Sequence, residues 1–173
     1  ANNENGIVLY SSSNNSISGN RFNDDGLVVW DSYGNSVENN TVNGKPLVYL
    51  ENVSNYNVYD AGQVILVKCE NIRVEGGNIS NTDVGVQLLE TKNSVISGNN
   101  ITNNWLGILL LERSSNNSVS GNNISANNET GIWLSDDSNY NSVSNNYISA
   151  NWTGILFEWG SNNNSISGNT ITN

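Results

Sequence analysis

Short apolar tetrads recur along the chain, and most of them follow a glycine. Six tetrads align on that residue, at Gly6, Gly26, Gly85, Gly107, Gly131 and Gly154. Successive glycines are 20, 59, 22, 24 and 23 positions apart. The longest interval is close to three periods, and residues 47–50 and 64–67 supply two further tetrads within it. A fixed period of this length indicates a solenoid.

Each period also carries two further short β segments. An Asn-Ser-Val/Ile motif follows the tetrad, as at 117–119, and a third segment such as 123–125 comes next. Because strand side chains alternate between faces, Ile108 and Leu110 are expected to point inward and Leu109 and Leu111 outward. No segment has a 3.6-residue period.

The pattern therefore predicts an all-β fold, a right-handed parallel β-helix of about seven to eight rungs of roughly 22 residues with three short strands per rung. We expect a single domain over residues 1–173. The repeat is irregular at about 44–83, where the tract 51–60 lies between two tetrads. This tract is either a loop that bulges from one edge or an irregular rung.

The corners are rich in Gly, Asn and Ser, which tolerate the left-handed backbone that tight corners require. One corner has a recurring asparagine, and stacked amides can hydrogen-bond along the axis as a ladder. The predicted ladder residues are Asn20, Asn99, Asn122, Asn145 and Asn169.

The composition excludes several classes of function. The chain has no His or Met and a single Cys, which rules out His/Cys metal clusters and Ser-His-Asp or Cys-His catalysis within it. The net charge of −10 disfavours nucleic acid and anionic membrane surfaces as partners. No apolar run approaches the roughly 18–20 residues of a membrane span, so we expect no membrane insertion.

The phrases at 13–20, at 127–134, and at 44–49 leading to 60–64 resemble the parallel β-helix repeats of NosD-type proteins and of carbohydrate-binding and sugar-hydrolase (CASH) domains. The resemblance covers essentially the whole chain. It implies a β-helix from an archaeal surface protein, hence an extracellular location at the cell surface. The copper role of NosD does not carry over well, because copper favours His, Met and Cys. We therefore expect no cofactor other than Ca²⁺.

Three carboxylates fall five residues after the column glycine on consecutive rungs: Glu90, Glu112 and Asp136. Carboxylates stacked about 5 Å apart repel one another unless they bind a hard cation or share a proton. They are candidates for a Ca²⁺ site, for a carboxylate pair in glycoside hydrolysis, or for solvated charge at a turn. No catalytic residue is assigned.

Several tryptophans lie close to the tetrads. We expect the Trp133 side chain to point outward from its strand, as those of Leu109 and Val86 do. Outward aromatic rings can stack on sugars or bury a neighbouring chain, and packing at the corners is the alternative. The carbohydrate-binding candidates are Trp105, Trp133, Trp152 and Trp159.

Asn-x-Ser/Thr sequons are dense, as an Asn- and Ser-rich repeat produces by chance, and several can carry glycan if they face outward. They begin at Asn14, Asn39, Asn52, Asn78, Asn100, Asn116, Asn123, Asn128, Asn151 and Asn163.

Joining residues 170–173 to residues 1–7 recreates the internal junction at 123–132. This match predicts either end-to-end stacking of separate chains or adjoining rungs of a longer parent chain. The leading hypothesis is a non-enzymatic structural glycoprotein that self-assembles in a surface layer, sheath or filament. The alternatives are a carbohydrate-binding module with glycans as partners, and a polysaccharide lyase or hydrolase.

Overall fold

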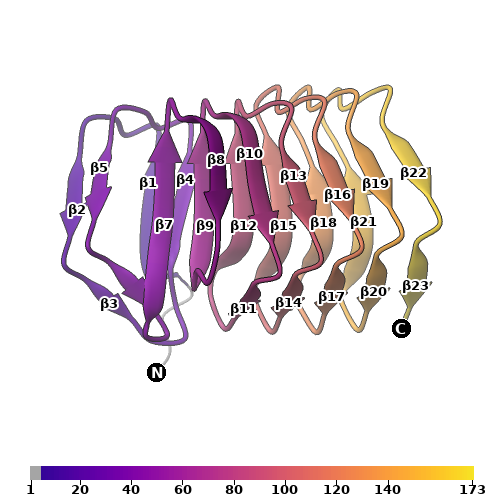
Figure 1. Ribbon diagram of the computed structural model, residues 1–173, viewed down its shortest axis with the longest axis horizontal. Coiled ribbons are helices and arrows are strands. Elements are labelled where there is room, and N and C mark those ends of the chain that lie inside the picture. Colours follow the sequence, from indigo (N-terminus) through magenta and orange to yellow (C-terminus); the bar gives the residue numbers. More distant parts are fainter. Residues whose placement is uncertain (1–4) are drawn as a thin grey trace.

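The computed structural model describes residues 5–173, which form 23 strands. Figure 1 shows these strands stacked in successive turns along the long axis of the molecule, with the last turn at one end. The described residues contain no helix that is long and apolar enough to cross a membrane.

The regular part of the molecule has three parallel faces. The first face is the largest sheet and contains the apolar tetrads from residue 47 onward; its strands pair in parallel except at one hairpin near the N-terminal turns. Its strands, in spatial order, are β21 (Thr153–Phe157), β18 (Thr130–Leu134), β15 (Leu106–Leu111), β12 (Val84–Leu89), β9 (Gln63–Val67), β7 (Lys45–Glu51), β6 (Thr41–Val42) and β3 (Arg21–Phe22).

The other two faces are narrower and complete each turn. The second contains β22 (Ser165–Ser167), β19 (Ser142–Ser144), β16 (Ser118–Ser120), β13 (Val95–Ser97), β10 (Glu70–Glu75) and β8 (Ser54–Val58). The third contains β11 (Asn78–Ser80), β14 (Asn100–Thr102), β17 (Asn123–Ser125), β20 (Tyr147–Ser149) and β23 (Thr170–Thr172).

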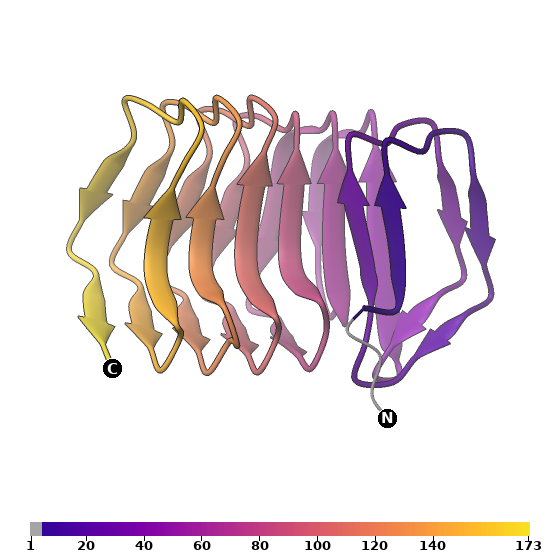
Figure 2. The same ribbon diagram turned by 180° about the vertical axis from the view of Figure 1, so that it is seen from behind.

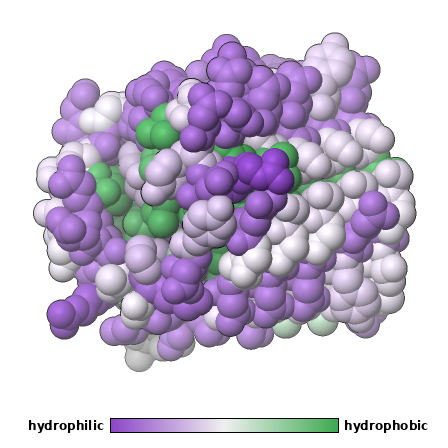
Figure 3. Space-filling view, viewed as in Figure 1, coloured by the Kyte–Doolittle hydropathy of each residue, from purple (hydrophilic) through white to green (hydrophobic). Residues whose placement is uncertain are grey.

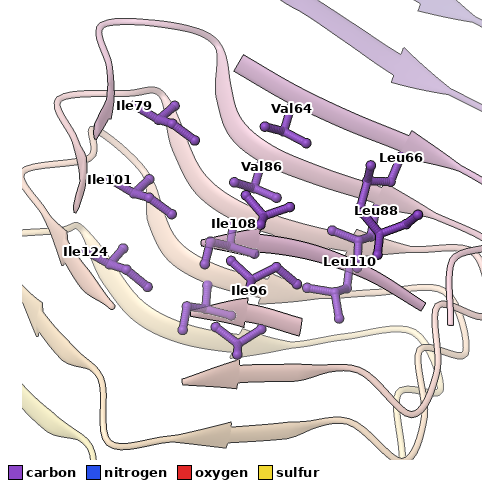
Figure 4. Close-up of a cluster of buried hydrophobic side chains, with 14 of the residues drawn as sticks. Val64, Leu66, Ile79, Val86, Leu88, Ile96, Ile101, Ile108, Leu110 and Ile124 are labelled. Atoms are coloured by element: carbon purple, nitrogen blue, oxygen red, sulfur yellow. The ribbon is translucent and has the colours of Figure 1, made fainter. Parts of the chain in front are cut away.

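Equivalent residues of successive turns lie directly over one another. Ile108 pairs with Ile132, which pairs in turn with Ile155. Inward side chains from the three faces, among them Ile96 and Ile124, fill the interior in parallel rows (Figure 4). The parallel β-helix predicted from the repeat is therefore confirmed, and each short strand is stabilised by the turns on either side.

The first two turns depart from this stack. Strands β1 (Ile7–Tyr10) and β4 (Leu27–Trp30) form a two-stranded sheet of their own, and β2 (Ser16–Ser18) and β5 (Ser36–Glu38) form another. Figure 2 shows strands β1 and β4 in front of the N-terminal end of the first sheet. The expectation that the tetrads at Gly6 and Gly26 continue the same column is therefore wrong.

The N-terminal turns cover the outward side of the first sheet. Leu109 and Leu111 point outward, as predicted, but both are fully buried in a second apolar cluster. Leu27 and Val29 of β4 belong to the same cluster. The main sheet is thus apolar on both faces because another layer packs against its outer side.

Two buried glutamines complete the free edge of β4. The side-chain amide of Gln63 accepts from Leu27 N–H at 3.0 Å and donates to Leu27 C=O at 2.8 Å. Gln87 forms the same pair of bonds with Val29. These two amides replace the neighbouring strand that β4 lacks on this side, so its buried backbone groups remain hydrogen-bonded.

The change of direction occurs at a tight hairpin, where β6 pairs with β7 in the antiparallel sense. Asn43 and Gly44 both have positive φ, 50° and 80°, which favours Asn-Gly in such a turn. Asn43 Nδ2 then donates to the carbonyls of Ser80 and Asn81 at the edge of the third face. Within the irregular segment 44–83, the tract 51–60 contains strand β8, which pairs with β10.

Three asparagine ladders connect the corners. In the first, Asn122 accepts from the backbone and side-chain N–H groups of Asn99 and donates to Ile96 C=O. The regular members of the ladders are Asn99, Asn122, Asn146 and Asn169; Asn117, Asn141 and Asn164; and Asn104, Asn127 and Asn151.

The predicted ladder differs from this arrangement at one position. Asn20 stacks on Asn40 in the N-terminal turns, and Asn99, Asn122 and Asn169 lie in the main ladder. Asn145 does not belong to it. The ladder residue is Asn146, which is buried, whereas Asn145 is exposed with φ of 55°. The side of the molecule seen in Figure 3 is largely hydrophilic, with apolar side chains mainly near the N-terminal turns.

Substituting Gln87 with Met tests whether the Gln87 side chain satisfies the backbone N–H and C=O groups of Val29 at the free edge of β4. Met keeps the length of the side chain but cannot bond to Val29, so two buried backbone groups lose their partners at a cost of about 1–3 kcal/mol each. We expect the Val29 amide to lose protection from hydrogen exchange, while the Ile108 amide keeps it. Unchanged protection of Val29 would contradict the role assigned to Gln87.

Candidate functional site

A hollow of about 450 Å³ lies where the N-terminal turns meet the outward face of the main sheet. Its lining comes from strands and from the corners that follow them, on both parts of the molecule. The lining residues are Val8, Tyr10, Ser11, Trp30, Asp31, Glu112, Trp133, Asp136 and Trp159. Residues more than 140 positions apart in the sequence therefore meet at one surface.

Aromatic side chains form much of this wall. The rings of Trp30 and Trp133 meet edge to face, with centroids 6.1 Å apart and an interplanar angle of 63°. Tyr10 and Trp159 remain largely exposed, at 73% and 67% of their surface. An exposed aromatic surface in a concave site is suited to binding a flat, partly apolar ligand.

The strand register explains why the Trp133 side chain faces the hollow. Trp133 pairs with Leu109 and Leu156, so it belongs to the outward row of the first sheet. Placing Val86 in the same row is wrong, because Val86 pairs with Ile108 and faces the interior. Gln87 occupies the outward position on that turn.

Carboxylates occupy the other part of the wall, at corners with a left-handed backbone. Asp31, Glu112 and Asp136 have φ of 43°, 47° and 53°. Glu112 Oε1 accepts from Asp31 N–H at 3.0 Å, and its other oxygen accepts from the Tyr33 hydroxyl. Burial and the hydrogen bonds with Glu112 and Glu90 raise the pKa of Tyr33, so its hydroxyl remains a donor.

The proposed Ca²⁺ ligands are therefore arranged differently from a cation cage. Glu90 and Glu112 share the single hydroxyl proton of Tyr33, and Lys68 lies over the Tyr33 ring at 3.8 Å. Asp136 lines the hollow. Among residues 5–173, no group of three or more His, Cys, Asp or Glu side chains is placed to hold a metal ion.

A second hollow, of about 590 Å³, lies at the other end of the same junction and is mostly polar. Asp25, Asp83 and Trp105 are among its lining residues. Asp83 is almost completely buried, and its Oδ2 accepts from Gly6 N–H at 3.2 Å. Burial, together with the nearby Asp25 carboxylate, raises the pKa of Asp83 to about 6.

The remaining tryptophan candidate stands apart, since Trp152 is 85% exposed and lines neither hollow. Most sequon asparagines are exposed: Asn14, Asn39, Asn52, Asn78, Asn116, Asn123, Asn128 and Asn163. Asn100 is partly buried, and Asn151 is a ladder residue whose oxygen accepts from Asn127.

Sequence reasoning did not select Tyr10, Trp30 or Asp31 as site residues. Asp31 occupies the same place after its glycine as Glu112 does. This equivalence was the available signal, but it gives no indication that the two corners face each other.

The raised pKa of Asp83 predicts a pH dependence of stability. Between its ordinary value of 3.8 and about 6, the folded chain keeps a proton that the unfolded chain releases. The free energy of unfolding therefore falls as pH rises through this range, by on the order of 1–3 kcal/mol. We expect Asp83→Asn to remove this component and to raise Tm at pH 7, measured by thermal unfolding from pH 4 to 8. The matched control is Glu38→Gln, at an exposed carboxylate; an identical pH profile for Asp83→Asn and the unmodified chain would contradict the assignment.

Comparison with known structures supports the fold. The periplasmic alginate epimerase AlgG, as a T265N T268M double mutant, matches with a TM-score of 0.52 and 17% sequence identity. The match covers 95% of this chain and 47% of that one, so the chain spans about half the length of the epimerase. A search of curated proteins found no match.

The profile of a family described as periplasmic copper-binding protein (NosD) matches residues 24–173. The donors present here do not fit a copper ion, because the sequence has no His or Met, and the buried thiol of Cys69 shares its single proton between the Leu50 and Val67 carbonyls. The match nevertheless extends over most of the repeat array, and the fold is the parallel β-helix that the repeats encode. The chain belongs to the NosD family.

Proposed function

We propose that this chain is a non-enzymatic, glycan-binding β-solenoid of the cell envelope. The observation that carries the proposal is the hollow between the N-terminal turns and the main sheet, where Trp30, Trp133 and Trp159 line one wall. A volume of about 450 Å³ lies within the usual range of ligand pockets, roughly 300–1,000 Å³.

The composition of the wall suits a sugar. Aromatic rings provide flat apolar surface for the C–H face of a pyranose ring, and Tyr and Trp keep a polar edge for solvent or ligand. Carboxylates are acceptors that can take hydrogen bonds from sugar hydroxyls. Asp31 and Asp136 are positioned for that role, since both line the hollow beside the rings.

The chemistry of the wall supports binding rather than turnover. Glycoside hydrolysis needs one carboxylic acid and one free carboxylate on opposite sides of the scissile bond. Here both oxygens of Glu112 already accept hydrogen bonds, from Asp31 N–H and Tyr33 O–H. No His is available anywhere in the chain to act as a general acid or base.

A location outside the cytoplasm is part of the proposal. Both the matched family and the structural neighbour are described as periplasmic. The neighbour is also described as an alginate epimerase, so a related β-helix acts on a polysaccharide. These similarities support a cell-envelope role for this chain.

A glycan array tests the proposal, followed by calorimetry of the best ligand. We expect Trp159→Ala, at an exposed ring, to weaken binding by about 10-fold, or roughly 1.4 kcal/mol. Trp133→Ala is expected to weaken it at least as much. Trp152→Ala is the matched control, because this ring lies outside the hollow. Equal losses for Trp152 and Trp159, or cleavage of the bound glycan that Asp136→Asn abolishes, would overturn the proposal.

A second candidate function is structural, and the edge of the last turn favours it. Strands β21, β22 and β23 end their sheets, and Ile166 and Ile171 are about half exposed there. We propose that another β-helical turn pairs with this edge, either from a second copy or from adjoining rungs of a longer parent chain. The part of the predicted junction that falls on residues 1–4 lies outside the described residues.

Electron microscopy of the purified chain tests self-association at this edge. We expect end-to-end particles that Ile166→Lys together with Ile171→Lys disperses, because two charges would be placed on an apolar end surface. Lysine substitutions at the exposed residues Tyr56 and Tyr59 are the control for added charge. Particles that persist in the double isoleucine variant, or a uniform monomer of the unmodified chain, would contradict stacking.

A further inference from the structure

We infer that the hollow selects positively charged glycans, and that its ligand is an oligosaccharide of amino sugars with free amino groups. This inference rests on the proposed glycan-binding function and names the class of glycan. It follows from the charges and rings that line the hollow, together with the position of the nearest bases.

The hollow contains negative charge that the protein leaves uncompensated. Asp31 Oδ2 accepts only a hydroxyl hydrogen bond, from Ser11 at 3.0 Å. The carboxylate of Asp136 forms neither a hydrogen bond nor an ion pair within residues 5–173. None of the lining residues in that range is Lys or Arg. A ligand with an ammonium group would therefore supply the missing positive charge.

The nearest bases point elsewhere. Arg113 follows Glu112 directly in the sequence, but its guanidinium lies 3.9 Å from Glu90 Oε1. Lys68 also lies 4.0 Å from Glu90 and covers the Tyr33 ring. Glu90 is not among the residues that line the hollow. Both cations thus stabilise the neighbouring corner and leave the hollow acidic.

The aromatic wall favours the same kind of ligand. Indole and phenol rings attract cations to their faces, with an energy of about 0.5–2 kcal/mol per contact. Trp159 and Tyr10 offer exposed rings next to Asp136 and Asp31 along the same lining. An amino sugar combines an ammonium group with a pyranose face, so it can use the carboxylates and the rings together.

Other ligand classes fit less well. A uronate polymer would bring further negative charge to a chain whose net charge is already −10. A bare metal ion would meet carboxylates in the lining, but among residues 5–173 no three His, Cys, Asp or Glu side chains are placed to hold a metal ion together. A neutral sugar can stack on the rings but leaves Asp136 without a counter-charge.

The inference is tested by calorimetry at pH 6 with four tetrasaccharides: a glucosamine oligomer, its N-acetylated form, a neutral glucose oligomer and a uronate oligomer. We expect the glucosamine oligomer to bind about 10-fold tighter than its acetylated form, which corresponds to one cation–π contact plus one partly exposed charge pair. Asp136→Asn should reduce that preference by about 5-fold and weaken binding of the neutral oligomer by less than about 2-fold, because Asn keeps one oxygen acceptor for sugar hydroxyls and loses only the charge.

The control separates a local effect from general attraction to an acidic protein. Glu38→Gln removes the same charge from an exposed strand, and we expect it to leave the preference unchanged within about 1.5-fold, because salt screens distant charges. Equal or tighter binding of the acetylated oligomer, or the same effect from both substitutions, would overturn the inference while leaving glycan binding intact. Failure of all four oligomers to bind would instead count against the proposed function.

Discussion

Hydrogen bonding between successive turns is the constraint on which this molecule depends. Its strands are mostly three to six residues long, too short to persist alone, so each is stabilised by the turns above and below it. The corners cannot use strand pairing in the same way. Stacked amides such as Asn122 solve this problem, because one side chain accepts from the Asn99 N–H and donates to the Ile96 carbonyl, both of the preceding turn. The polar composition of the chain is therefore compatible with a fully bonded interior.

The same constraint explains how the N-terminal turns are held. Once the hairpin at Asn43–Gly44 reverses the chain, β4 has a strand neighbour on only one edge. Gln63 and Gln87 provide the other edge through their side chains, and they occur where an outward residue would otherwise be apolar. The docked turns bury Leu109 and Leu111 but leave Trp133 partly uncovered. The hollow lies where the N-terminal turns cease to cover the outward face of the main sheet.

The sequence predicts the repeat well, because each period has an apolar tetrad and two further short β segments, and no segment has a 3.6-residue period. It does not reveal where the stack reverses, since the tetrads at Gly6 and Gly26 look like all the others. The fully apolar row of Leu109 and Leu111 was a usable signal, because a row facing water is normally polar. The choice between Asn145 and Asn146 could not be made from the sequence, as adjacent asparagines differ only in the backbone conformation that the corner imposes.

The site was beyond sequence reasoning for a related reason. Trp133, Glu112 and Asp136 were selected individually, but the opposite wall comes from Tyr10, Trp30 and Asp31, which meet them only through the docking of two separate sheets. Belonging to the NosD family accounts for the repeated turns and not for this junction, and the copper donors that the family description implies do not fit this chain. A β-helix can gain a binding site without changing its repeat, because a reversal of the stack places the edge of β4 against the outward face of the main sheet. The chemistry of this chain is therefore to be sought at the boundary between its two stacks, where the regular pattern is interrupted.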